Sequence, residues 1–149
     1  CKDMKTVFVG VDPDVDKSGY CLVDDKFKIE KITTLDLMDL IVELTALQAT
    51  IDGSVIVFVE AGWKNKTNFH VGAMDNTWKS AKIGSHVGAN HEIGRQIIKF
   101  CEKVGIECHA IKPKGHKMSA LDFKRISGWT KRTNQEMRDA YKIILEAMK

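Results

Sequence analysis

Four carboxylates of this chain stand at positions where charged side chains are uncommon. Asp12 directly follows the apolar run VFVGV, and Glu60 directly follows VIVFV. Glu136 and Asp139 are three residues apart, which places them on one face of a helix. Because removing a carboxylate from water is expensive, such groups are rarely buried unless they pair with a cation or bind a metal. The set therefore predicts a cation site.

The chemistry of such a site follows from its oxygen ligands. Mg²⁺ prefers oxygen donors, and two such ions roughly 4 Å apart can flank a scissile phosphate. One ion would activate the attacking water, and the other would stabilise the leaving oxygen. We expect two Mg²⁺ ions, replaceable by Mn²⁺, held by the four catalytic carboxylates Asp12, Glu60, Glu136 and Asp139.

Each carboxylate also has an ordinary explanation. Asp12 and Glu60 could be strand-end acids that face solvent. The residues Thr133-Asn134-Gln135-Glu136 fit a helix capping box, in which Glu136 would bond the backbone at the start of a helix. For each acid taken alone these alternatives stay open.

The hydrophobic pattern predicts the elements that must position these acids. Apolar, β-branched runs predict strands, and apolar residues at helical spacing predict helices. The expected strands are 7–11, 19–23, 26–33, 55–59 and 106–111, and the expected helices are 37–51, with Thr34 as its N-cap, 85–104, 119–126 and one that begins at Thr133. A helix between sequential strands favours a parallel crossover.

This order, βββαβαβαα, predicts an α/β protein with a mixed five-stranded sheet and flanking helices. It is the element order of the ribonuclease-H-like fold. With 149 residues and neither a repeat nor a linker-like tract, we expect residues 1–149 to form a single nuclease domain of that fold.

The charge is distributed unevenly along the chain. Residues 1–60 carry 6 basic and 12 acidic side chains, whereas residues 61–149 carry 17 basic and 8 acidic. Between residues 112 and 132, seven basic side chains face one acid. This excess predicts contact with a polyanion such as DNA, with binding that weakens as salt rises. The candidate DNA contacts here are Lys112, Lys114, Lys117, Lys131 and Arg132.

A long basic connection follows Glu60. Residues 61–84 lack periodicity, and long connections in compact domains are usually functional or mobile. Lys64 and Lys66 are further candidate DNA contacts, and Trp63 is a candidate for stacking on an unpaired base. The other aromatics of this stretch, Phe69 and Trp78, are expected to pin the loop to the domain.

The remaining composition excludes several protein classes. The four cysteines show no CxxC pair, which predicts a reduced, cytoplasmic protein, and the five histidines lack zinc-ligand spacing. No apolar run approaches the roughly 18 residues of a membrane span, so no membrane partner is expected.

Three motifs resemble those of the RuvC-type Holliday junction resolvases, and of their short phage-type members in particular. VGVDPDVDKSGY (9–20) resembles the first-strand motif, VFVEAGW (57–63) the glutamate strand, and TNQEMRDA (133–140) the C-terminal acid pair. They occur in the order of that family. Two positions depart from it: Asp14 replaces a usual glycine, and Glu136 stands where bacterial members have aspartate.

The resemblance implies a dimeric, Mg²⁺-dependent crossover junction endodeoxyribonuclease that nicks four-way DNA junctions in recombination and repair, leaving 5′-phosphate and 3′-hydroxyl ends. It implies that Asp12, Glu60, Glu136 and Asp139 are the metal ligands. Trp63 occupies the place of an aromatic that stacks near the branch point, and Lys117 that of a basic residue beside the catalytic centre. Residues 85–104, with their small side chains, become the candidate homodimer interface.

Two other functions are compatible with the same residues. A ribonuclease-H-type nuclease that cuts RNA in RNA/DNA hybrids would use the same four acids. A non-catalytic module that binds branched DNA would explain the basic surface and leave the acids as caps and strand ends.

Overall fold

The computed structural model describes the backbone of residues 4–64 and 77–149, and the side chains of residues 4–64 and 87–149. The expectations for Lys66, Phe69 and the side chain of Trp78 lie outside these residues. No helix in the described part of the chain is long and apolar enough to cross a membrane.

The core element is a mixed five-stranded sheet with the order β3-β2-β1-β4-β5. Its strands are β1 (Lys5–Asp12), β2 (Ser18–Val23), β3 (Ile29–Leu35), β4 (Gly53–Glu60) and β5 (Glu107–Ile111). The first three strands form an antiparallel meander, and β4 and β5 add to β1 in parallel. The predicted fold class is confirmed, and each strand lies within a few residues of its expected range.

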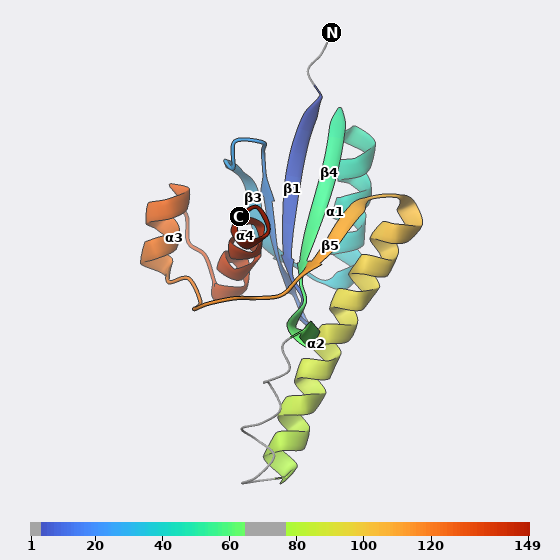
Figure 1. Cartoon of the computed structure of the whole chain (residues 1–149), viewed down its shortest axis with the longest axis vertical. Coiled ribbons are helices and arrows are strands. Elements are labelled where there is room, and N and C mark those ends of the chain that lie inside the picture. The colour runs from blue at the N-terminus through green and yellow to red at the C-terminus, as the bar shows by residue number, and fades with distance from the viewer. Residues whose placement is uncertain (1–3, 65–76) are drawn as a thin grey trace.

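Helices cover both faces of the sheet (Figure 1). They are α1 (Leu37–Thr50), α2 (Thr77–Val104), α3 (Ala120–Ser127) and α4 (Gln135–Ala147), with a short 3-10 turn, η1 (Gly62–Lys64), after β4. Alternation along β1 separates two cores, because successive side chains of a strand point to opposite faces. Val7, Val9 and Val11 pack with α1 and α2, whereas Phe8 packs with α4.

Two predicted helix starts are wrong. Thr34 is not the N-cap of α1, since it pairs with Gly19 within the sheet; Asp36 takes that role and accepts from the Asp39 backbone N–H. Asn134, not Thr133, caps α4 by accepting from the Met137 N–H.

The α2 helix begins at Thr77, eight residues before the expected start at residue 85. Its first turns extend past the sheet, on the side where η1 lies (Figure 1). Residues 77–84 show no regular apolar spacing, so periodicity could not detect them. The Gly105 end was predicted correctly, and this glycine has the positive φ of a helix terminus, 79°.

Candidate active site

Asp12 and Glu60 lie side by side at the carboxyl ends of two parallel strands. The β1–β4 register pairs Val11 with Val59, so that Asp12 and Glu60 are the next residues of each strand. Both share a strand face with phenylalanines of the core under α4, Phe8 and Phe58. Both are half-buried. Each acid is thus partly withdrawn from solvent and beside the other, rather than isolated at a strand end.

The α4 helix brings Glu136 and Asp139 to the same edge, and two glycines of the sheet allow its close approach. A Cβ at Gly10 would overlap the Ala140 carbonyl oxygen, and a Cβ at Gly19 would overlap the Glu136 carbonyl oxygen. Gly19 is also the register partner of Asp12. The backbone at Glu136 thus lies against β2, next to the strand that carries Asp12.

The capping-box interpretation of Glu136 is wrong. A capping box needs the acid three residues after the N-cap, and the residue three after Asn134 is Met137. Glu136 instead lies in the first turn of α4, where the helix dipole favours a negative charge. Its half-buried carboxylate is available for another role.

The pKa of Asp12 reflects its burial and the other three acids near it. Burial, reinforced by a hydrogen bond to the Glu60 carboxyl and by its charge, raises the pKa of Asp12 from 3.8 to about 10. The charges of Asp139 and Glu136 act in the same direction. The physical causes are desolvation and repulsion between like charges. A cation placed among these groups would relieve both effects.

The donor set suits a hard divalent ion. The ion pairs between described residues involve other groups, so none of the four acids has a Lys or Arg partner within 4.0 Å in that part of the chain. As the side chains stand in the described residues, no three Asp, Glu, His or Cys groups converge tightly enough to form a complete metal site. Carboxylate oxygens without a cationic partner are what Mg²⁺ or Mn²⁺ requires.

A pocket of about 190 Å³ opens beside two of the acids. Glu60 and Asp139 line it together with Lys114, Lys117 and Lys142. It therefore combines carboxylates with ammonium groups, as a site for a phosphodiester and its counter-ions would.

The loop that forms the rim of this pocket is tied to α4. Lys142 Nζ donates to the Lys114 carbonyl oxygen at 2.7 Å and pairs with Glu146 at 3.1 Å. The Lys114 N–H donates to Glu146 Oε2 at 3.2 Å. These bonds hold residues 113–117 over the pocket, with Lys114 and Lys117 exposed at its edge.

A second pocket, of about 170 Å³, lies on the other side of Asp12 and Glu60. Asn90 and His91 of α2 line it. Asn90 Oδ1 accepts from the Val15 N–H at 2.8 Å, which ties the turn after β1 to α2. Burial and the nearby Arg95 lower the pKa of His91, which favours its neutral form. The acids thus lie between two polar hollows.

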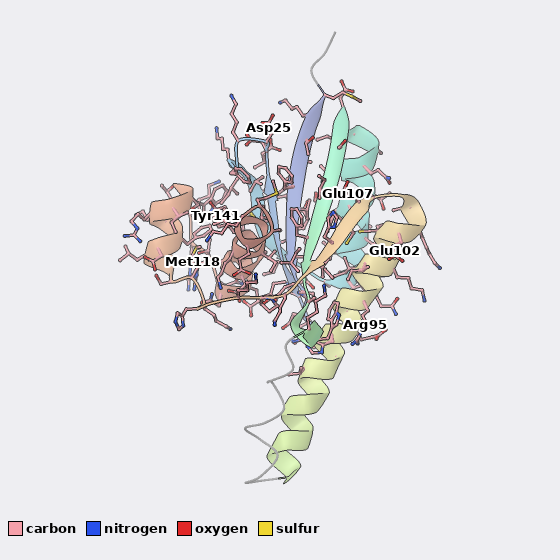
Figure 2. All side chains as sticks on the ribbon, in the orientation of Figure 1. Asp25, Arg95, Glu102, Glu107, Met118 and Tyr141 are labelled. Atoms are coloured by element: carbon pink, nitrogen blue, oxygen red, sulfur yellow. The ribbon has the colours of Figure 1, made fainter. Side chains whose placement is uncertain are left out.

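Trp63 is packed within the protein. Its ring lies under the Arg95 guanidinium, 5.1 Å from the centroid, and edge-on to His91 at 5.7 Å. A Cβ at Gly94 would come within 2.7 Å of the Trp63 ring and 3.1 Å of Pro13. Arg95 is labelled beside η1 in Figure 2. The absence of a side chain at Gly94 therefore makes room for Trp63 and Pro13 of the same chain. A Cβ at Gly88 would meet no described atom within 4 Å.

The remaining basic candidates lie on the surface. Lys112, Lys131 and Arg132 are exposed, and Lys131 lies over the Trp129 ring at 5.6 Å. Lys64 Nζ donates to the Ala110 carbonyl oxygen at 2.9 Å, which ties η1 to β5.

Sequence reasoning missed several polar residues around the acids. They are Asn90, His91, Gln135, Arg138, Lys142 and Glu146. Lys142 and Glu146 could have been found, because they follow Asp139 at i+3 and i+7 on one helix face. Asn90 and His91 gave no signal, since only tertiary packing brings α2 to this edge.

No family model matches the chain, and no curated protein matches it. Among solved structures, it is similar to T. thermophilus RuvC in complex with Holliday junction substrate, with a TM-score of 0.52 and 16% identity over 93% of this chain and 90% of that one. A second Thermus thermophilus RuvC structure matches with a TM-score of 0.50 and 15% identity over 93% and 91%. The resemblance first seen in three motifs is thus confirmed for the architecture, and the chain has the ribonuclease-H-like fold of RuvC.

Proposed function

We propose that this protein is a structure-selective DNA endonuclease that resolves four-way junctions by metal-dependent phosphodiester hydrolysis, leaving 5′-phosphate and 3′-hydroxyl ends. The observation that carries the proposal is that Asp12 and Glu60 end adjacent parallel strands, with Glu136 and Asp139 of α4 near enough for their charges to act on Asp12. The fold of RuvC supports it, because the neighbour of this fold was solved with a Holliday junction.

The carboxylates have the role of metal ligands in this proposal. Asp12, Glu60, Glu136 and Asp139 would hold two Mg²⁺ ions, or Mn²⁺ in their place. When bound, the ions supply Lewis acidity that activates water and stabilises charge developing on the phosphate. Asp12 and Glu60 are fixed by adjacent strands, and Glu136 and Asp139 by the first turns of α4, so all four project from rigid elements.

The basic residues bind and orient the DNA strand. Lys114 and Lys117 at the rim of the 190 Å³ pocket are placed to neutralise phosphates next to Glu60 and Asp139. The exposed Lys112, Lys131 and Arg132 extend the positive surface. Lys64 and Trp63, which already have partners within the protein, would contribute at its border.

Resolution of a junction needs two paired nicks, so the proposal includes a homodimer. Residues 85–104 of α2 are the candidate interface because their small side chains would allow the close approach of a second helix. Light scattering after gel filtration tests this part separately: a mass near 33 kDa, twice the 16.7 kDa of one chain, is expected.

The function is tested with three labelled substrates: a four-way junction, a linear duplex and an RNA/DNA hybrid. We expect Mg²⁺-dependent, symmetrically paired nicks in the junction alone. Cleavage confined to the RNA strand of the hybrid would instead establish a ribonuclease-H-type activity. Junction binding without cleavage in either Mg²⁺ or Mn²⁺ would establish a non-catalytic module.

A further inference from the structure

The first turn of α4 carries a hydrogen-bonded amide that the proposed function leaves unassigned. Gln135 Nε2 donates to Asp139 Oδ1 at 2.8 Å and to the Met118 carbonyl oxygen at 3.3 Å. Arg138 Nη2 donates to Gln135 Oε1 at 3.1 Å. A guanidinium can only donate, and an ionised carboxylate can only accept. The two charged neighbours therefore determine which end of the Gln135 amide faces each of them.

Arg138 is itself held from two sides. Its Nε donates to the Met118 carbonyl oxygen at 3.2 Å, and its Nη1 donates to the Thr133 carbonyl oxygen at 3.0 Å and to Thr133 Oγ1 at 3.1 Å. Met118 precedes α3, next to α4, as Figure 2 shows. Arg138 of α4 thus bonds to residues on both sides of α3, Met118 before it and Thr133 after it. These bonds restrict the guanidinium to one orientation.

We infer that Gln135 is a positioning residue that holds the Asp139 carboxylate in its metal-binding orientation, and that Arg138 holds Gln135 in turn. The inference rests on the proposed function for the identity of the ions. A donor outside the ligand set restricts the rotation of the ligand, and loss of such donors commonly weakens metal binding about 10- to 100-fold. Gln135 and Asp139 are both partly shielded from water, which limits replacement of this bond by solvent.

A purely structural role for Gln135 predicts something different. A Gln–Asp pair at i, i+4 adds little to the stability of a helix, and Asn134 still caps α4 without it. The bonds of Gln135 to Met118 and Arg138 are only partly buried, and Arg138 keeps its own bonds to Met118 and Thr133. Removal of the donor should therefore leave metal-free stability nearly unchanged while metal affinity falls. Measurements of folding stability and of cation affinity therefore distinguish the structural role from the positioning role.

The test compares Gln135→Met with the wild type by calorimetric titration of Mn²⁺ and by thermal unfolding in EDTA. Methionine preserves the length of the side chain and removes the donor. We expect Mn²⁺ binding to weaken about 10- to 100-fold, with the unfolding temperature in EDTA unchanged. Wild-type Mn²⁺ affinity in Gln135→Met would overturn the inference.

Gln48→Met is the matched control. Gln48 Nε2 donates to the Val104 carbonyl oxygen at 2.9 Å, near the strand starts of β4 and β5 and so at the opposite end of the sheet from the acids. Its loss should leave Mn²⁺ affinity at the wild-type value, and an equal weakening in both variants would overturn the inference.

Arg138→Lys gives an intermediate perturbation, since lysine retains the charge and loses the fork. We expect a smaller loss of Mn²⁺ affinity than in Gln135→Met, with faster tryptic cleavage after Lys117 because the Met118 carbonyl loses one of its two donors and retains Gln135. Wild-type Mn²⁺ affinity in this variant would contradict the role of Arg138.

Junction cleavage is read separately from the titration. A wild-type protein that binds Mn²⁺ but leaves junctions uncut contradicts the proposed function, while the affinity ratio still decides the role of Gln135.

Discussion

A single added methyl group, at Gly10 of β1, would disturb the close packing of α4 on the sheet. Gly10→Ala adds a methyl group that would overlap the Ala140 carbonyl oxygen and come within 2.8 Å of Ile144 Cγ1. Because Cβ atoms essentially never approach heavy atoms closer than 3.0 Å, and the carbonyl is backbone, the helix itself must move. The required displacement is about 1 Å, the size of shift that alters catalytic geometry.

The displacement has two consequences of predictable size. Overpacking of a well-packed core costs about 1–3 kcal/mol, which lowers the unfolding temperature of a domain of this size by roughly 2–12 °C. Because Glu136 and Asp139 move with α4 while Asp12 and Glu60 stay with the sheet, the nicking rate should fall about 100-fold. Circular dichroism melting and single-turnover junction cleavage, well below the unfolding temperature, measure these two effects.

Val42→Ala is the control for the melting experiment. Val42 is exposed on α1, outside the candidate homodimer interface, and alanine is the better helix former, so the unfolding temperature should stay level or rise. A Gly10→Ala protein that melts and cuts like the wild type would refute the seating of α4 on Gly10.

Three other perturbations address the site and its rim. Asp12→Asn should bind a four-way junction without cutting it. It should also lose the stabilisation by Mg²⁺, which is about 2.7 kcal/mol at a Mg²⁺ concentration 100 times the Kd. Thermal melts with Mg²⁺ and with EDTA check this, and an undiminished rise in unfolding temperature would contradict it. Lys142→Met removes the donor to the Lys114 carbonyl, so limited trypsin digestion should cut faster after Lys114 and Lys117; an unchanged cleavage pattern would argue against the tie. Lys117→Ala should weaken junction binding and reduce the slope of log affinity against log salt by about 1, whereas an unchanged slope would mean that Lys117 does not contact phosphate.

The sequence was most informative where local physical rules operate alone. The apolar, β-branched run VIVFV favoured a buried strand. The alternation of side chains along a strand then placed Glu60 on the same face as Phe58, which packs in the core under α4. The i, i+3 spacing of Glu136 and Asp139 likewise required no tertiary knowledge.

The failures arose where tertiary contacts decide. Thr34 is an acceptable N-cap by residue type, but pairing with Gly19 keeps it in β3. The first turns of α2 show no apolar periodicity, so the sequence pattern placed the start of this helix eight residues too late. The seating of α4 on Gly10 and Gly19 was invisible as well, because a glycine in a strand does not reveal which backbone lies against it.

The most direct measurement is the cleavage of a synthetic four-way junction, labelled on each strand in turn, by the wild type and by Asp12→Asn in Mg²⁺ and in EDTA. We predict symmetrically paired nicks from the wild type in Mg²⁺, none in EDTA, and none from Asp12→Asn despite retained binding. Equal cleavage by Asp12→Asn, or cleavage by the wild type in EDTA, would contradict a catalytic centre built on these four carboxylates.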